Sequence, residues 1–430
     1  MLRGFSGGVH PPEDKTTETC AIEIVPPPKR VCIPFSQHTG KPARPLVQKD
    51  DLVRIGTKIG ESDGFISVPI HSSVAGKVIA IEQYAHPVLG SAECCIIEST
   101  DSDEWETNIM ENQNYEQLTR EELLGIIKEA GIVGLGGAAF PTHVKLTPPP
   151  EKPIDTLIIN GCECEPMLTA DHRLMLEYPT GITEGAKLFL KILGAHNLIF
   201  AVEDNKKNAA EIVKQEGVDV RLVKTKYPQG AEKQLIKALL NREVPRGGLP
   251  MDVGCVVQNV GTCYAAFQAA RYQKPLIDRV VTVTGTGVKE SKNVLVRIGT
   301  PAIDVINYCG GYTNPPKKII FGGPMMGIAQ YTEYVPIIKG TSGIIVWSEV
   351  PDESEDPCVR CASCVNVCPM GLMPTEIYAF VRNKKFSKAK EYGVLDCIEC
   401  GCCAYACPAK IRLVHYLKYG KSEVWRLSKK

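Results

Sequence analysis

The 430-residue sequence contains no long uncharged apolar run, and none approaches the roughly 18 residues that a membrane-spanning helix needs. We therefore expect no transmembrane segment and expect any membrane attachment to go through partner proteins. Net charge is also absent: 49 basic and 49 acidic side chains cancel, which argues against nucleic acid or anionic lipid as a partner. The first ten residues lack the apolar segment of a secretory signal, so we expect a reducing, cytoplasmic compartment. The length allows roughly three domains.

Cysteine is abundant, at 18 residues, and part of it forms two runs of identical spacing. The runs are Cys358-x2-Cys361-x2-Cys364-x3-Cys368-Pro and Cys397-x2-Cys400-x2-Cys403-x3-Cys407-Pro. Each run matches the bacterial two-cluster ferredoxin pattern, in which three thiolates hold one cluster and the fourth cysteine binds the other. The spacing predicts one [4Fe-4S] cluster on Cys358, Cys361, Cys364 and Cys407, and a second on Cys368, Cys397, Cys400 and Cys403.

Zinc sites and disulfides are the alternative interpretations of these runs. Zinc sites usually pair two Cys-x2-4-Cys units at a distance, and disulfides at this density belong to small secreted chains. Cys402, between two predicted ligands, is interpreted as a bystander.

Residues 1–112 are rich in strand-forming residues and punctuated by prolines. Apolar segments at 20–25, 66–70, 78–81 and 94–98 alternate with turns, which favours a β-rich domain. The segment 66–80 resembles a biotinyl or lipoyl hairpin, but Lys77 lacks the sequence context of a modified lysine. We interpret the domain as a β-sandwich used for docking, with a covalent swinging arm as the alternative. His71 and His86 are expected to be turn or surface residues.

A helix and a glycine-rich loop follow the linker at 101–117. Thr119 and Glu122 form a capping box, and the apolar residues after them predict a helix that ends near residue 131. The next segment, 131–145, has glycine at positions 131, 134, 136 and 137. Such a loop leaves backbone N–H groups unshielded, so it can wrap a phosphate or a flat ring, and Lys145 can supply the counter-charge.

Strand-like and helix-like segments then alternate in α/β fashion. Strands are expected at 155–160, 197–203 and 218–223, and helices at 181–193, 205–216 and 233–240. The polar cluster at 160–166 follows the first strand, where open α/β sheets bind ligands. Cys162 and Cys164 in this cluster leave a metal half-site as an alternative. Two further candidate segments, 227–232 and 258–262, each lead into a helix.

Strand periodicity returns between residues 279 and 347, with strands expected at 280–284, 294–298, 318–321 and 343–347. This unit looks like a β-grasp domain that binds a ligand or acts as a spacer. An acidic linker leads to the cysteine runs, and the basic segment after them is expected to be a solvated helix.

The glycine-rich loop resembles the flavin loop of the complex I flavoprotein subunit (the 51 kDa family), Gly-Leu-Arg-Gly-Arg-Gly-Gly-Ala-Gly-Phe-Pro-Thr-Gly-x-Lys. Together with the start Gly-Gly-Val-His-Pro-Pro-Glu at 7–13 and the double cysteine run, it resembles the RnfC family of Rnf electron transport complexes over essentially the whole chain. The resemblance implies an α/β multidomain fold with a barrel-sandwich hybrid domain (1–112), a Rossmann-like FMN/NADH domain (118–275), a β-grasp, SLBB-like domain (278–347), a ferredoxin-like domain with two [4Fe-4S] clusters (352–415) and a basic tail (416–430).

The resemblance also implies cofactor-binding residues. FMN would be held by Gly134, Gly136, Gly137 and Lys145, with Lys145 near its phosphate, Asn160 at the ring system, and Asn259 and Thr262 at the ribityl-phosphate end. Phe140, Glu165 and Glu232 would meet the nicotinamide nucleotide, and Tyr227 and Gly230 match a Tyr-x-x-Gly-Glu-Glu turn. The chain departs from the complex I pattern at Val133, Leu135, Cys162 and Ala231, which we interpret as subgroup differences.

The implied function is electron passage between NAD(H), FMN and two [4Fe-4S] clusters, coupling ferredoxin:NAD oxidoreduction to Na⁺ or H⁺ movement. The implied partners are the cluster-bearing RnfB and the membrane proteins RnfA, RnfD, RnfE and RnfG, with ferredoxin as the indirect partner and no nucleic acid. The implied location is peripheral, at the cytoplasmic face of the cell membrane. Two alternatives are a soluble subunit of an NADH-linked hydrogenase or dehydrogenase, and a flavin-free electron-relay subunit.

Overall fold

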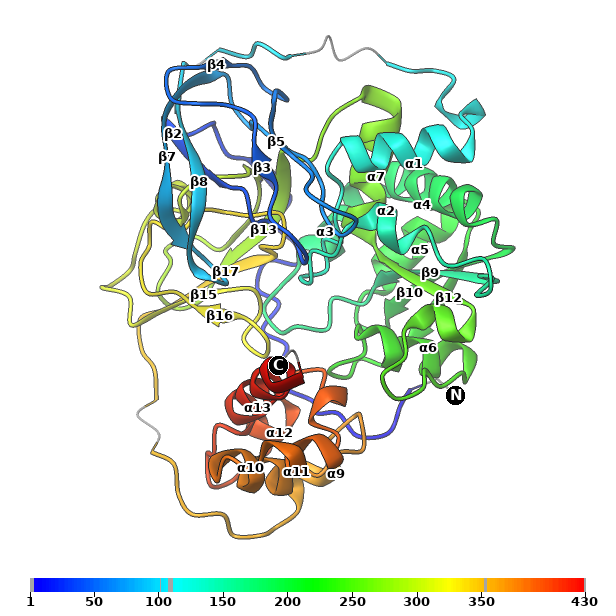
Figure 1. The fold of residues 1–430 in the computed structure, drawn as a ribbon, viewed down its shortest axis with the longest axis vertical. Helices are drawn as coiled ribbons and strands as arrows, with labels where there is room; N and C mark the ends of the chain where they lie inside the picture. Colours follow the sequence, from blue (N-terminus) through cyan, green and yellow to red (C-terminus); the bar gives the residue numbers. More distant parts are fainter. Residues whose placement is uncertain (1–3, 101, 107–110, 352–353, 429–430) are drawn as a thin grey trace.

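A computed structural model describes residues 4–100, 102–106, 111–351 and 354–428. Figure 1 shows an upper β-rich part in blue, an α/β part in green beside it, a second β-rich part in yellow below the first, and a helical part in orange and red at the bottom.

The N-terminal β-rich part contains two antiparallel sheets. One has the order β2 (Arg30–Pro34), β8 (Gly90–Ser99), β7 (Gly76–His86) and β4 (Leu52–Val53); the other has β3 (Arg44–Pro45), β5 (Lys58–Glu61) and β6 (Ile70–His71). Both sheets contribute to one apolar core, as the buried residues Ile33, Ile59 and Val78 illustrate. The sheets therefore pack face to face as a sandwich.

The structure corrects the expected surface position of two histidines in this part and argues against the swinging-arm alternative at Lys77. His71 and His86 are buried rather than at the surface, and the ring of His86 is hydrogen-bonded to the Ser36 carbonyl (2.7 Å). Lys77 lies inside β7 and pairs with Asp50 (2.7 Å), so it is not the turn lysine of a swinging arm.

The α/β part is a four-stranded parallel sheet in the order β11 (Asp219–Val223), β10 (Asn197–Glu203), β9 (Thr156–Gly161) and β12 (Cys255–Asn259). The sheet is flanked by α1 (Arg120–Glu129), α2 (Thr142–Lys145), α3 (Ala170–Glu177), α4 (Pro179–Leu193), α5 (Lys207–Gln215), α6 (Glu232–Leu240) and α7 (Val260–Tyr272). Alternate residues of β9 face opposite sides: Leu157 and Ile159 pack in the core with α4 and α7, and Ile158 packs in the core with α6. Helices thus cover both faces of a Rossmann-like sheet.

The predicted helix after the linker is confirmed. It begins after Thr119, whose hydroxyl accepts from the N–H of Glu122 while the Glu122 carboxylate accepts from the N–H of Thr119 (2.7 Å), forming a capping box. Helix α3, which directly follows the polar cluster at 160–166, was not expected from the sequence.

The second β-rich part is a six-stranded sheet in the order β1 (Ile22–Ile24), β14 (Lys292–Arg297), β13 (Asp278–Thr284), β17 (Gly343–Trp347), β15 (Lys318–Phe321) and β16 (Ile328–Ala329), with α8 (Ala302–Tyr308) packed on it. The expected strands at 280–284, 318–321 and 343–347 are present. Strand β1 corrects the sequence interpretation: it belongs to this sheet, parallel to β14, and not to the N-terminal sandwich. The sequence assigned it to the nearest β-rich segment because pairing across about 270 residues leaves no local pattern.

The helical part holds both cysteine runs. It contains α9 (Ser363–Asn366), α10 (Pro374–Arg382), α11 (Phe386–Glu391), α12 (Cys402–Tyr405) and α13 (Leu413–Ser428). The expected division at residue 415 is wrong, because α13 continues through it. Helix α13 is not a fully solvated tail: Leu417 and Val424 are buried in a core with Ile377 and Val381 of α10.

Candidate functional site

The carboxyl end of the parallel sheet brings together several of the predicted flavin residues. Asn160 near the end of β9 lies opposite Asn259 at the end of β12, where α7 begins. The glycine-rich loop lies on this edge. The N–H of Leu135 donates to the Thr262 hydroxyl (2.9 Å), and a Cβ added to Gly136 would lie 3.5 Å from the Cβ of Asn259. The structure therefore places the loop, Asn259 and Thr262 at one site.

The loop leaves backbone open where the resemblance predicts it. Gly136 and Gly137 are exposed, and a Cβ at Gly137 would meet nothing within 4 Å. Gly134 and Phe140 close the base of the turn, since the N–H of Gly134 donates to the Phe140 carbonyl (2.9 Å). Open backbone N–H groups beside the first turn of α7 fit a flat or phosphorylated ligand.

Buried charges lie behind this edge. Asn259 donates from its amide to Asp171 (2.6 Å) and accepts at its carbonyl oxygen from the N–H of Gly261 (2.9 Å). Burial, and next the neighbouring Glu163, raise the pKa of Asp171 to about 7. Arg279 is also buried beside the loop, its guanidinium donates to the Leu135 carbonyl (3.4 Å), and burial lowers its pKa to about 10. These contacts fix the orientation of the Asn259 side chain and of the loop.

The turn at residues 227–232 contacts the same edge. The Asn160 amide donates to the Gly230 carbonyl (2.8 Å), and Glu232 at the start of α6 forms an ion pair with Lys145 at the end of α2. Both charged side chains are partly exposed, so a ligand phosphate can reach Lys145 by displacing Glu232. The structure brings these four residues together, although the resemblance assigns Lys145 and Glu232 to different ligands.

Glu165 and Tyr227 make their polar contacts with other parts of the protein. The Glu165 carboxylate accepts from the N–H groups of Met325 and Met326 (3.0 Å each) and from the Tyr227 hydroxyl (3.3 Å). The same hydroxyl donates to the Cys400 carbonyl (2.8 Å). Burial raises the pKa of Glu165 to about 7. The two side chains therefore occupy a junction between the α/β part, the six-stranded sheet and the cysteine runs.

The second predicted cluster site is a cavity. Cys368, Cys397, Cys400 and Cys403 line a small pocket, whose other walls are almost entirely apolar and include Met370, Leu372 and Leu417. Four thiols from both runs around one apolar space fit a cubane with the predicted crossing ligand. Cys402 also borders this space beside Cys400, and its thiol contacts the Tyr227 carbonyl (3.9 Å).

The cysteines of the other predicted cluster lie nearer the surface. Cys358 and Cys361 are exposed, Cys407 is half-buried and Cys364 is buried. The pKa of Cys364 is raised, first by burial and then by the neighbouring thiols of Cys407, Cys358 and Cys361. Among the described residues no three Cys, His, Asp or Glu side chains converge on a single-ion site. A cubane does not require such convergence, because each of its irons binds a different cysteine sulfur.

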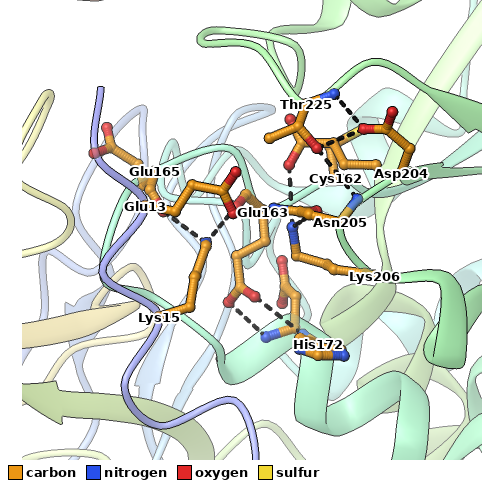
Figure 2. Close-up of polar contacts among 12 residues, drawn as sticks. Glu13, Lys15, Cys162, Glu163, Glu165, His172, Asp204, Asn205, Lys206 and Thr225 are labelled. Atoms are coloured by element: carbon orange, nitrogen blue, oxygen red, sulfur yellow. Dashed lines mark hydrogen bonds and ion pairs between the residues drawn. The ribbon is translucent and has the colours of Figure 1, made fainter. Parts of the chain in front are cut away.

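A polar network near the sheet edge was missed by the sequence analysis. Figure 2 shows Lys15 and Glu13 from the N-terminal segment beside Glu163, Glu165, Asn205 and Lys206. The carboxylate of Glu163 accepts from the N–H groups of Asp171 (2.8 Å) and His172 (3.1 Å), so it caps α3. An acidic residue before a helix start was the available signal for Glu163, whereas no local pattern identifies Lys15.

Comparison with known proteins follows the same order of parts. Family models match as an RnfC barrel sandwich hybrid domain (residues 3–102), a Nuo51 FMN-binding domain (127–268), an SLBB domain (280–329) and a 4Fe-4S dicluster domain (351–408). The chain is 50% identical to the C subunit of the proton-translocating ferredoxin:NAD(+) oxidoreductase complex of Clostridium ljungdahlii, covering 98% of this chain and 94% of that protein. The chain belongs to the RnfC family.

Two further relatives are C subunits of the same kind of complex. Identity is 43% to the C subunit of the Na(+)-translocating ferredoxin:NAD(+) oxidoreductase complex of Acetobacterium woodii (98% of this chain, 97% of that one). It is 38% to the C subunit of the ion-translocating oxidoreductase complex of Rhodobacter capsulatus (98% and 84%). An NAD+-reducing [NiFe]-hydrogenase shares the fold with a TM-score of 0.51 at 17% identity, over 76% of this chain and 69% of the hydrogenase chain.

The family assignment confirms the expected fold class: a barrel-sandwich hybrid, an FMN-binding domain of the complex I type, an SLBB domain and a dicluster domain. It also confirms FMN and [4Fe-4S] clusters as the cofactor classes of this RnfC chain. In the part of the chain that the structure describes, every helix is too short or too polar to cross a bilayer.

Proposed function

We propose that this RnfC chain exchanges electrons with NAD(H) and passes them between FMN and two [4Fe-4S] clusters, within a complex that couples ferredoxin:NAD+ oxidoreduction to Na⁺ or H⁺ translocation. The turn at residues 227–232 carries the proposal. Gly230 in this turn contacts Asn160, Glu232 contacts Lys145, and Tyr227 contacts Cys400. One short segment thus joins the predicted flavin residues to a predicted cluster ligand.

For the flavin we assign the open backbone of Gly134, Gly136 and Gly137, with Lys145 at its phosphate. Asn160, Asn259 and Thr262 border the same edge of the sheet, and the exposed backbone at Gly136 and Gly137 supports the fit. Phe140, Gly230 and Glu232 are assigned to the nucleotide side. We assign Glu165 and Tyr227 to holding the domains together, because their polar atoms bond to protein.

For the clusters we assign Cys368, Cys397, Cys400 and Cys403 to the enclosed cavity, and Cys358, Cys361, Cys364 and Cys407 to the site nearer the surface. When bound, FMN and the clusters supply hydride exchange with NAD(H) and single-electron storage. The protein binds and orients them, and the apolar walls around the enclosed site exclude water and favour its lower-charge state. The half-exposed site is suited to exchange with an external redox protein.

The partners we propose are the other Rnf proteins. RnfB, which carries clusters, would exchange electrons with the surface-near site, and RnfA, RnfD, RnfE and RnfG would couple this exchange to ion movement. Ferredoxin would react elsewhere in the complex. The chain would be peripheral, on the cytoplasmic face of the membrane.

Anaerobic purification, iron and FMN quantitation, and an NADH titration followed by absorbance and EPR test the proposal. We expect about eight irons and one FMN per chain, with both chromophores bleached by NADH. About eight irons without flavin after FMN reconstitution, and without bleaching, would favour a flavin-free relay. Full NADH-dependent activity with a soluble partner after removal of membranes would favour a soluble dehydrogenase subunit.

A further inference from the structure

The N-terminal segment at residues 7–18, here called the strap, crosses from the cluster domain to the α/β domain. Figure 1 shows it as the dark blue line that passes the helical part before it rises toward the sheets. At its first residues the N–H of Gly8 donates to the Val367 carbonyl (2.8 Å), and Val9 pairs with Tyr227 through two backbone hydrogen bonds of 2.9 and 3.0 Å. The strap therefore bonds to both domains within three residues.

The cluster end of the strap is packed closely against a predicted ligand. A Cβ at Gly7, whose φ is +77°, would lie 2.7 Å from the backbone oxygen of Cys368. Val9 is buried in a small apolar group with Tyr227, Cys400 and Cys402. The strap thus contributes a buried side chain to the contact between the turn at 227–232 and the enclosed cluster site.

The other end of the strap holds the loop that follows β9. The buried ammonium of Lys15 donates to the backbone oxygens of Glu163 (2.8 Å), Glu165 (2.9 Å) and Leu168 (2.6 Å). Three donors of one ammonium meet three carbonyls, so the lysine ties this loop at three points. The Glu13 carbonyl adds a bond from the N–H of Met167 (2.8 Å). Figure 2 shows Lys15 reaching into the loop.

We propose that the strap is a positioning element for electron transfer: it fixes the enclosed cluster site, through Gly7 and Val9, against the flavin-side loops that Lys15 holds. This inference rests on the proposed function. The contacts cited for Gly7, Val9 and the Lys15 ammonium are all to backbone or apolar groups of the protein, and the proposal gives these residues no contact with flavin or nucleotide. Loosening the strap should slow electron passage from flavin to cluster and leave the reaction of NADH with the flavin unchanged.

The first test compares Gly7→Ala with Gly217→Ala in the full chain. Gly217 has nearly the same φ, +78°, but a Cβ there would meet nothing within 4 Å. The two variants therefore have similar backbone strain, and only Gly7→Ala adds a clash with the Cys368 backbone. Stopped-flow absorbance after mixing with NADH resolves flavin bleaching from cluster bleaching. We expect equal flavin rates and a cluster rate several-fold lower in Gly7→Ala, because the clash with the Cys368 backbone increases the distance that the electrons must cross.

The second test compares Lys15→Met with Lys29→Met, the same change at an exposed lysine. The Lys15 ammonium bonds to the loop after β9 rather than to a cysteine run. The two lysine variants therefore test the role of the strap even if Gly7→Ala loses iron. The proposed role of the strap is supported if only the cluster-bleaching phase slows in Lys15→Met, with FMN and iron contents equal to those of Lys29→Met. Unchanged rates, or flavin and cluster phases that slow together, would overturn it. Failure of the proposed function is distinct, since the wild type itself would then show no NADH bleaching.

Discussion

The ion pair between Lys145 and Glu232 allows the flavin assignment to be tested by two substitutions of opposite expected effect. A lysine that donates to an FMN phosphate makes a charge-assisted hydrogen bond worth about 1.5–3 kcal/mol. To do so it must leave Glu232, and this partly exposed pair is worth about 0.2–1 kcal/mol. Lys145→Met should therefore weaken FMN binding by about 1–2 kcal/mol, or about 5- to 30-fold in Kd.

Glu232→Gln should act in the opposite direction. It removes the carboxylate that competes with the phosphate for Lys145, so FMN should bind as tightly as in the wild type or somewhat more tightly. Neither variant should change the free energy of unfolding by more than about 1 kcal/mol, since the pair is partly exposed. Weakened binding in Lys145→Met thus cannot be attributed to a general loss of stability.

Fluorescence titration of the flavin-depleted protein with FMN measures both effects. The matched control is Lys152→Met, because Lys152 forms a similar partly exposed ion pair with Asp252 (2.5 Å), and neither residue belongs to the glycine-rich loop. The reasoning is refuted if Lys145→Met binds FMN within about twofold of Lys152→Met. It is refuted equally if Glu232→Gln weakens binding as much as Lys145→Met does.

Three further predictions test the clusters, a buried charge and a helix cap. Cys402→Ala should keep the full iron content, whereas Cys403→Ala should lose about half of it, and iron quantitation would contradict the ligand assignment if the two variants behaved alike. Burial lowers the pKa of Lys339 to about 7, below the lysine value of the unfolded chain, so the wild type gains stability as pH rises from about 7 to about 10. Lys339→Met should lack this gain. If the free energy of unfolding, measured with urea, changed with pH in the same way in both proteins, this role of Lys339 would be excluded. Thr119→Ala removes the capping box of α1 and should cost about 1 kcal/mol in the same assay; a change below a few tenths would show that the cap contributes little.

The sequence predicted those parts of the fold that depend on contacts between residues close to one another in the chain. The capping box at Thr119 depends on contacts three residues apart, and the α/β alternation depends on the side-chain periods of strands and helices. The cysteine spacing predicted that Cys368 from one run would join Cys397, Cys400 and Cys403 from the other. The structure brings these four together because two short loops face each other.

Contacts between distant segments could not be predicted in this way. Strand β1 pairs with β14 across about 270 residues, and Lys15 bonds to carbonyls about 150 residues away, so neither leaves a periodic pattern. Glu165 was assigned to the nucleotide by its place in a motif. Its neighbours in space, Met325 and Tyr227, come from other segments and determine its contacts.

Close backbone approach at the junction of three domains explains why the enclosed cluster site lies against the flavin domain. A Cβ at Gly401, in the second cysteine run, would lie 2.8 Å from the Met325 oxygen. A Cβ at Gly323 would lie 2.2 Å from a carboxylate oxygen of Glu165. Any larger residue at either position would push the cysteine run or the six-stranded sheet outward. Since Tyr227 contacts both Glu165 and Cys400, such a shift would change the spacing between the turn at 227–232 and Cys400. Glycine at these positions, and at position 7 of the strap, therefore sets how near the turn at 227–232 and the six-stranded sheet can lie to the cysteine runs.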